Sequence, residues 1–265
     1  MTDRRVLLVT GAGTGIGAAT AELASSRGWQ VVLCGRRRAP LEEVSARTGA
    51  TVHQVDIDDG EALDALVEAV VREFGRLDCV VANAGTMAVG SVVDTAPDDW
   101  DAVIRTNLTS VYRLTRAAVP YLVKAHGSVV GVSSIAALRS PTSTAAYSAS
   151  KAGLVSLVLS IARDFGPVGV RANVVSPGWV RTEMADGEMA EFGGPHGLDV
   201  EAAYAAATEL VPQRRAAAPA EIAAAIVWLA SDEAGYVNGA NLVVDGGTVL
   251  VDAGTVPFDY RLTPR

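Results

Sequence analysis

The sequence has almost no lysine. Of its 22 basic residues, only Lys124 and Lys151 are lysines, and all the others are arginines. Because the chain uses arginine for nearly every positive charge, a lysine suggests that its position needs an ammonium group. Lys151 lies in the stretch STAAYSASKAGL, residues 143–154, four residues after Tyr147. This spacing makes Lys151 the first candidate for a chemical role.

Cysteine and histidine are also scarce, with two and three residues in a chain of 265. Cys34 and Cys79 lie in apolar runs, which predicts two buried, reduced thiols rather than a disulfide or a nucleophile, as in reducing cytoplasm. His53, His126 and His196 lack metal-ligand spacing, so no metal site is expected. His196 alone, in a glycine-rich segment, could contact a substrate.

Long apolar runs and an excess of positive charge are missing too. No run approaches the roughly 18 apolar residues of a membrane helix, and the run before the first glycines is too short for a signal-peptide core. The net charge of -8 repels phosphate backbones. We therefore expect a cytoplasmic protein with neither a membrane nor a nucleic acid as partner.

Short β-branched runs alternate with segments of helical spacing. Strands are expected at 5–10, 30–34, 51–55, 78–83, 128–134, 170–176 and 240–245. Helices are expected at 15–27, 39–47, 60–74, 97–124, 146–165 and 219–231, and the alanine-rich run 202–225 is also interpreted as helix. Because the strands lack polar alternation, they predict a doubly wound α/β fold, a parallel sheet with helices on both faces.

No linker divides the chain, so we expect a single dinucleotide-binding and catalytic domain at 1–250. Residues 178–218, with four glycines in DGEMAEFGGPHGLD, are interpreted as a mobile lid over the substrate. Residues 251–265 form a C-terminal extension. Its Pro257, Phe258 and Tyr260 suggest that it covers a subunit interface or a neighbouring pocket.

A glycine-rich turn, TGAGTGIG at residues 10–17, follows the first strand directly and opens the first helix. Such a turn needs glycine where the backbone bends at positive φ or approaches a pyrophosphate closely, with helix N–H groups directed at the anion. We assign these roles to Gly11, Gly15 and Gly17, and include Thr14 and Ile16 in the contact set. The strand-to-helix context favours this interpretation over a turn without a ligand.

The end of the second strand indicates which dinucleotide binds. An acid there would bind the ribose 2′-hydroxyl, but the sequence reads Cys-Gly-Arg-Arg-Arg at 34–38. The Arg36 guanidinium could stack on the adenine or bind a 2′-phosphate as a planar bidentate cation, and Arg37 is included among the cofactor contacts. NADP(H) is therefore the preferred cofactor and NAD(H) remains possible. The alternative is an arginine cluster at an ordinary solvated helix start.

Tyr147 and Lys151 lie one helical turn apart on the same face of a predicted helix. An ammonium near a phenol stabilises the phenolate, so we expect Lys151, together with an oxidised nicotinamide nearby, to lower the pKa of Tyr147 from about 10 to about 7. A planar guanidinium would be less compact in this place. A tyrosine packed in the core with a satisfied hydroxyl is the alternative.

Taken together, these motifs resemble the short-chain dehydrogenase/reductase family over residues 5 to about 250. The resemblance includes the glycine turn, ANAG at 82–85, Asn107, Ser134 standing 13 residues before Tyr147, YSASK at 147–151, SPGWVRT at 176–182 and VDGG at 244–247. It implies a seven-stranded Rossmann-like sheet and a homotetramer or homodimer. Ala82 departs from the commoner first residue of the NNAG motif, which should matter little.

The resemblance also implies a role for each site residue. Tyr147 is the general acid/base, Ser134 orients the substrate oxygen, Lys151 holds the nicotinamide ribose and Asn107 anchors a water. The further cofactor contacts that it implies are Asp56, Ile57, Asn83, Ala84, Gly85, Pro177, Gly178, Val180 and Thr182. The substrate contacts that we expect are Ser134, Tyr147, Met87, Trp179 and Met184, with Leu138, Met189 and Phe192 either facing the pocket or packing against the lid.

The function expected is hydride transfer between NADP(H) and a ketone or secondary alcohol of medium size, rather apolar and conceivably cyclic. Two alternatives stay open. One is a redox-neutral isomerase or dehydratase on the same fold, and the other is a regulator that binds NADP(H) without chemistry.

Overall fold

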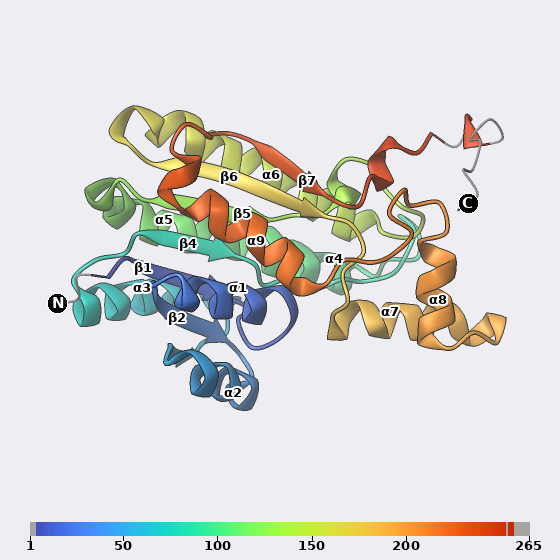
Figure 1. The fold of residues 1–265 in the computed structure, drawn as a ribbon, viewed down its shortest axis with the longest axis horizontal. Coiled ribbons are helices and arrows are strands. Elements are labelled where there is room, and N and C mark those ends of the chain that lie inside the picture. Colours follow the sequence, from blue (N-terminus) through green and yellow to red (C-terminus); the bar gives the residue numbers. More distant parts are fainter. Residues whose placement is uncertain (1–3, 253, 257–265) are drawn as a thin grey trace, which may run out of the picture.

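A computed structural model describes residues 4–252 and 254–256. Seven parallel strands form one sheet in the order β3-β2-β1-β4-β5-β6-β7, which confirms the predicted doubly wound fold (Figure 1). The strands are β1 (Val6–Thr10), β2 (Gln30–Gly35), β3 (Thr51–Gln54), β4 (Cys79–Ala82), β5 (Ser128–Val132), β6 (Arg171–Pro177) and β7 (Asn241–Val244).

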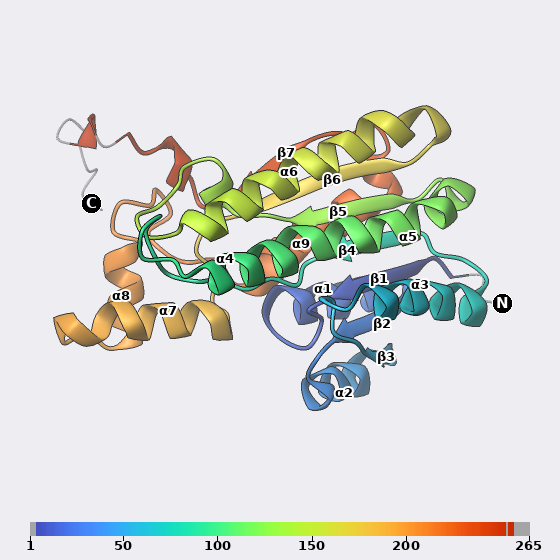
Figure 2. The ribbon, with the colours of Figure 1, turned by 180° about the vertical axis from the view of Figure 1, so that it is seen from behind.

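Helices cover both faces of this sheet (Figures 1 and 2). One face carries α1 (Gly15–Ser26), α2 (Arg38–Thr48) and α9 (Pro219–Ala230), and the other carries α3 (Gly60–Phe74), α5 (Ser110–Ala125) and α6 (Ala145–Phe165). Three helices lie towards the carboxyl ends of the strands: α4 (Pro97–Ile104), α7 (Glu183–Gly193) and α8 (Val200–Ala207).

The central strands are apolar on both sides because each side faces a layer of helices. In β1, Val6 and Leu8 pack with the α3, α5 and α6 layer, whereas Leu7 and Val9 pack with the α1, α2 and α9 layer. All four side chains are fully buried. Two-sided burial therefore explains the continuous apolar runs in the sequence.

The segment expected as one helix at 97–124 is divided in the structure. A π-helical turn, Arg105–Thr109, lies between α4 and α5. Such turns are rare and occur mostly at functional sites. Here the turn contains Asn107, whose side chain is fully buried. The alanine-rich run 202–225 is likewise not one helix, because α8 ends at Ala207 and α9 begins at Pro219.

The segment interpreted as a lid is largely helical. Its helices α7 and α8 enclose a small apolar cluster of their own, formed by Ala185, Met189, Ala203 and Tyr204. The two ends of the segment meet in a parallel bridge between Val180 and Ala217. The segment 180–217 therefore begins and ends at the same place on the main body.

Both cysteines are free and buried, as predicted. Burial raises the pKa of Cys34 to about 12 and that of Cys79 to about 11, so both stay protonated at neutral pH.

Among the described helices, the segment Ala145–Val168 is long and apolar enough to cross a membrane by length and composition. Its Leu154, Val158 and Ile161 belong to the apolar cluster beneath the sheet. This segment is therefore apolar because it packs in the core.

The described part of the C-terminal extension is short. The Arg139 guanidinium donates a hydrogen bond to the Val251 carbonyl, which holds the start of the extension near the turn after β5. Pro257, Phe258 and Tyr260 lie outside the described residues.

Gly17, in the first turn of α1, sets how closely this helix approaches the sheet. A Cβ atom there would lie 2.2 Å from the Gly11 carbonyl oxygen and 2.6 Å from Asn83 Nδ2. Backbone atoms cannot yield as a flexible side chain can, so only glycine fits.

We expect Gly17→Ala to lower the free energy of unfolding by about 2 to 3 kcal/mol, because the added methyl group overpacks this contact. The matched control is Gly187→Ala in α7, where a Cβ would meet nothing within 4 Å. It should cost nothing, or stabilise the protein by up to about 1 kcal/mol through helix propensity. Urea unfolding measures both, and equal midpoints for the two variants would contradict the steric argument.

Candidate active site

The glycine turn and the candidate catalytic residues lie at the carboxyl ends of the central strands. Gly11 and Gly15 adopt left-handed φ values of 63° and 55°, which other residues rarely adopt. The turn therefore requires glycine at both positions, as the sequence predicts. Thr14 precedes α1 in an extended conformation, and Ile16 packs against the core.

The N-terminus of α1 suits an anion. Thr14 makes no side-chain hydrogen bond to the helix, and the first turn contains no acidic residue. A Cβ at Gly15 would lie 3.0 Å from Thr182 Cγ2, so Thr182 lies directly over the turn. Free N–H groups, a positive helix end and an open glycine surface fit the pyrophosphate of a dinucleotide.

Asn83 fixes this turn to β4. Its Nδ2 donates to the carbonyls of Thr10 at 2.9 Å and Gly11 at 3.2 Å. Thr10 Oγ1 in turn accepts from the backbone N–H groups of Asn83 and Ala84, at 3.1 Å each. The first and fourth strands thus end in a common hydrogen-bonded frame, which steadies the expected binding surface.

The two arginines after β2 differ in their partners. Arg37 donates from both terminal nitrogens to the two carboxylate oxygens of Glu183, at 2.9 and 2.7 Å. Arg36 is exposed and forms no ion pair with any residue that the structure describes. Arg36 is therefore available to a phosphate, whereas Arg37 is already engaged.

The remaining expected cofactor contacts line the ends of β3 and β6. Asp56 is exposed and accepts a backbone hydrogen bond from Asp58, while Ile57 is buried in the core and exposes little beyond its backbone. Pro177 ends β6, Gly178 packs against Asp245, and Val180 is buried.

Tyr147 and Lys151 lie together on α6, as their spacing predicts. The Lys151 Nζ lies 5.6 Å from the centroid of the Tyr147 ring. Only 4 % of the Lys151 residue is exposed, and its Nζ donates to the Val132 carbonyl at 3.0 Å. Burial lowers the pKa of Lys151 to about 8.

The Asn107 side chain approaches Lys151 from the π-helical turn. A Cβ at Gly85 would lie 3.3 Å from both Asn107 Oδ1 and Lys151 Nζ, so Gly85 leaves room for the two groups to meet. Asn107 Oδ1 accepts from the Thr86 N–H at 2.8 Å, and Nδ2 donates to the Thr86 carbonyl at 2.8 Å and to Ser150 Oγ at 3.0 Å.

Burial dominates the pKa of Tyr147. It raises this pKa to about 12, a hydrogen bond with Ser134 lowers it in part, and the charge of Glu188 raises it. The groups of the protein therefore keep the phenol protonated at neutral pH. The expected pKa near 7, which includes an oxidised nicotinamide beside the ring, stays a prediction.

Sequence reasoning missed two carboxylates around the site. Glu188, on α7, lies close enough to Tyr147 for its charge to act on the phenol. Asp58 accepts hydrogen bonds from Thr106 Oγ1 at 2.9 Å with both carboxylate oxygens, and this contact anchors the π-helical turn beside Asn107. Neither has a local sequence motif, because both contacts join segments distant in the chain.

The expected substrate contacts have different environments. Met87 is half-buried in the loop after β4, and Met184 is exposed on α7. Trp179 packs against the apolar cluster of the lid. Met189 belongs to that cluster, and Phe192 stacks on His196 with ring centroids 5.5 Å apart, so both pack within the lid.

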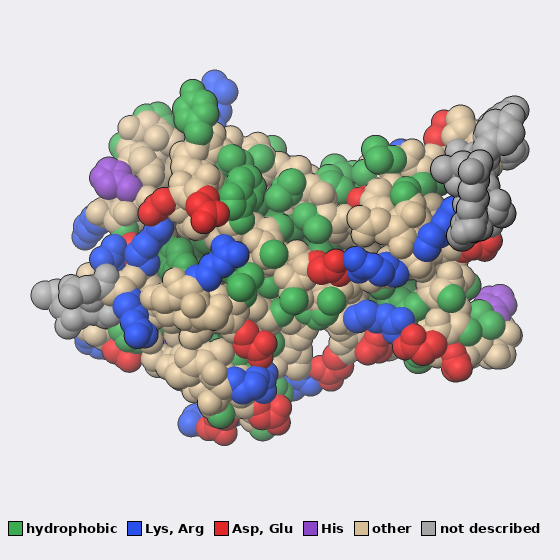
Figure 3. Space-filling model, viewed as in Figure 1, with side chains coloured by type: hydrophobic (Ala, Val, Ile, Leu, Met, Phe, Trp, Pro, Cys, Tyr) green, Lys and Arg blue, Asp and Glu red, His purple; other side chains and the backbone are tan. Residues whose placement is uncertain are grey.

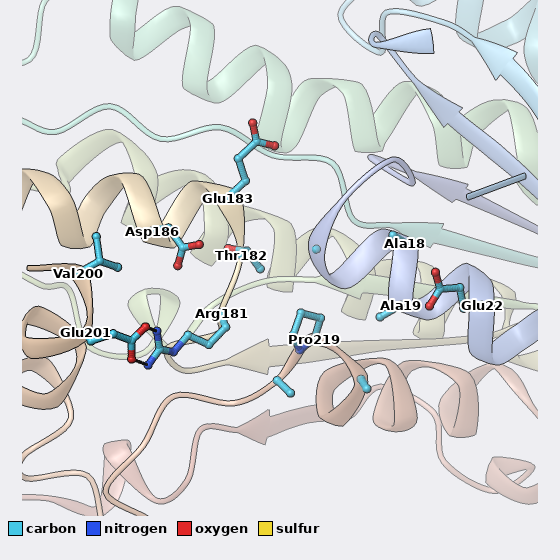
Figure 4. A pocket seen from close by; sticks show the side chains of 13 residues that line it. Ala18, Ala19, Glu22, Arg181, Thr182, Glu183, Asp186, Val200, Glu201 and Pro219 are labelled. Carbon is cyan, nitrogen blue, oxygen red and sulfur yellow. Dashed lines mark hydrogen bonds and ion pairs between the residues drawn. The ribbon is translucent and has the colours of Figure 1, made fainter. Parts of the chain in front are cut away.

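A cavity of about 660 Å³ lies between α1, the start of α9 and the lid (Figure 4). Gly15, Thr182 and Glu183 line it, and Arg181 and Glu201 face each other across one wall. Figure 3 shows this side of the molecule hollowed between the main body and the lid, with acidic and basic side chains beside the hollow. The cavity adjoins the phosphate end of the site rather than Tyr147.

Known proteins resemble this chain in sequence and in fold. Residues 11–249 match the family model described as enoyl-(acyl carrier protein) reductase. The chain is 34% identical over 246 residues to meso-2,3-butanediol dehydrogenase of Serratia marcescens, covering 92% of this chain and 94% of that protein. The crystal structure of levodione reductase superposes with a TM-score of 0.88 at 28% identity, covering 94% of this chain and 98% of that one.

A structure of actinorhodin polyketide ketoreductase with NADPH gives a TM-score of 0.87 at 32% identity, covering 92% of this chain and 97% of that one. The family match spans nearly the whole sheet, from the glycine turn to the end of β7. The chain therefore belongs to the short-chain dehydrogenase/reductase family, whose members oxidise alcohols or reduce carbonyl groups.

Proposed function

We propose that this oxidoreductase prefers NADP(H) and moves a hydride between the nicotinamide and a ketone or secondary alcohol, with Tyr147 as the general acid/base. The observation that carries the proposal is the convergence of Tyr147, Lys151, Ser134 and Asn107 at the carboxyl end of β5. Four groups from three segments meet there, as acid–base chemistry at one oxygen requires.

In the reduction, Tyr147 gives its proton to the oxygen of the substrate carbonyl. Its pKa of about 12 keeps the donor loaded at neutral pH, and the hydrogen bond with Ser134 favours the phenolate that forms. Ser134 orients the same oxygen.

NADP(H) supplies or accepts the hydride at its nicotinamide ring. The residues that would hold the cofactor are the glycine turn with Thr182 at the pyrophosphate and Arg36 at the 2′-phosphate. Lys151 donates to Val132 with one of its three N–H bonds, which leaves two for the nicotinamide ribose. Support for the preference comes from the absence of an acid at the end of β2 and from the NADPH of the actinorhodin ketoreductase.

The substrate that we propose is a medium-sized, rather apolar ketone or alcohol, with Met87, Trp179 and Met184 beside it. Butanediol dehydrogenase and levodione reductase, by their names, act on small alcohols or ketones, which supports the reacting group but not the apolar character. A cytoplasmic location and a homotetramer or homodimer complete the proposal, as predicted from the sequence.

We expect Tyr147→Phe to lower kcat by at least about 100-fold while the Kd of NADPH changes less than twofold, because only the transferable proton is removed. A panel of ketones and alcohols with each nicotinamide would supply the substrate for this measurement. Tyr236→Phe, on a fully exposed tyrosine, is the control and should retain full activity.

Unchanged turnover in Tyr147→Phe would contradict the proposed role. The panel also separates the other two functions, since an isomerase or dehydratase turns over without net change in nicotinamide absorbance, and a regulator binds NADPH without turnover.

We expect the rate of reduction to fall as the pH rises through about 8, because Lys151 loses its proton there and its positive charge disappears. Tyr147 keeps its proton to about pH 12, so it does not cause this decrease. In Lys151→Arg the charge no longer titrates near pH 8, and the larger group does not fit the buried site. This variant should show kcat lowered at least about 100-fold and a flat profile from pH 7 to 9.

The measurement is kcat against pH at saturating NADPH for both proteins, with circular dichroism to confirm that the variant folds. Near-normal activity of the arginine variant, or the same decrease at pH 8 in both proteins, would rule out the requirement for a compact ammonium.

A further inference from the structure

The Arg37–Glu183 pair joins two segments that are 146 residues apart in the chain. Arg37 precedes α2 at the end of β2, and Glu183 is the first residue of α7. Both side chains are about 60% exposed, yet the pair is bidentate, with both nitrogens and both oxygens in use. It therefore links the ribose end of the expected cofactor site to the lid.

This link uses the guanidinium surface that a 2′-phosphate would need. A guanidinium has five N–H donors, and a carboxylate and a phosphate bind its paired N–H groups in the same way. Glu183 occupies both terminal nitrogens of Arg37, so a phosphate must either displace the carboxylate there or bind the Nε edge beside a second negative charge. The Arg37 guanidinium also holds the pKa of Glu183 below its usual value, so the carboxylate stays charged at neutral pH.

The neighbouring residue has no such competitor. Arg36 is free of ion pairs with the described residues, and only its backbone carbonyl is engaged, by Gln54 Nε2 at 2.9 Å. The two arginines that the sequence suggests as equivalent phosphate ligands are thus made unequal by a residue of the lid.

We propose that Glu183 is a specificity-determining residue, which competes with the 2′-phosphate for Arg37 and so weakens binding of NADP(H) relative to NAD(H). The inference rests on the NADP(H) preference in the proposed function. It adds that Glu183, a residue of the lid, sets how strong this preference is. A dinucleotide without the 2′-phosphate leaves the Arg37–Glu183 pair intact, whereas NADP(H) must displace the Glu183 carboxylate or place its phosphate beside it.

The test is the Kd of NADPH and of NADH, measured by nicotinamide fluorescence on the full chain without substrate. Glu183→Gln keeps the shape of the side chain and removes its charge. We expect NADPH to bind about three- to fivefold more tightly and NADH to change less than 1.5-fold. In an Arg37→Gln background, the same substitution should change the Kd of NADPH less than 1.5-fold, because its partner is gone.

Two controls separate competition from a general change in charge. Glu42→Gln removes the same charge from the Arg38–Glu42 pair on α2. Glu201→Gln removes it from the bidentate Arg181–Glu201 pair of the lid. Both should leave the ratio of the two Kd values within 1.5-fold of the wild type.

The proposal would be overturned if Glu183→Gln left the ratio of the two Kd values unchanged, or if either control changed it equally. An effect of Glu183→Gln that persists without Arg37 would also overturn it, as would failure to bind either nucleotide. The proposed function fails on different results. A wild-type preference for NADH contradicts the NADP(H) assignment, and a lack of turnover contradicts the reaction, while the Kd ratio remains measurable in both cases.

Discussion

Burial of one ammonium group is the constraint on which the catalytic end of this molecule depends. A charge removed from water must be compensated by polar groups, or it loses its proton. Lys151 has a carbonyl from β5 within hydrogen-bonding distance, and Gly85 leaves room for both Lys151 Nζ and Asn107 Oδ1. A lysine in an arginine-rich chain, Gly85 after β4 and the Asn107 amide between α4 and α5 together meet one requirement. A compact cation must stay charged where it is shielded from water.

The π-helical turn shows how the fold meets this requirement. An uninterrupted α-helix over 97–125 would turn the same face of α4 and α5 towards the core. The extra residue of the turn instead rotates Asn107 inward, where the Thr86 backbone and Ser150 hold it. The Asp58–Thr106 hydrogen bonds fix the same turn from the segment after β3. One irregular element therefore holds Asn107 against α6 and is itself held by a distant part of the chain.

The sequence predicts those features that follow from local patterns. Unbroken apolar strands indicate two-sided burial, and left-handed φ values at Gly11 and Gly15 agree with their positions in the turn. The four-residue spacing places Tyr147 and Lys151 on one face. Features that depend on tertiary contacts escape such reasoning: the π-helical turn, the Arg37–Glu183 pair and the influence of Glu188. The rise in the pKa of Tyr147 through burial escapes for the same reason, since spacing gives the proximity of two groups but not the depth at which both are buried.

The lid has an apolar interior separate from that of the sheet. Ala185, Met189, Ala203 and Tyr204 pack with one another, and the whole segment joins the body where Val180 meets Ala217. A unit that packs on itself can change at these interior positions without disturbing the sheet. Protein engineers can therefore redesign α7 and α8 as one piece if they keep Val180, Thr182 and Glu183, which contact the main body.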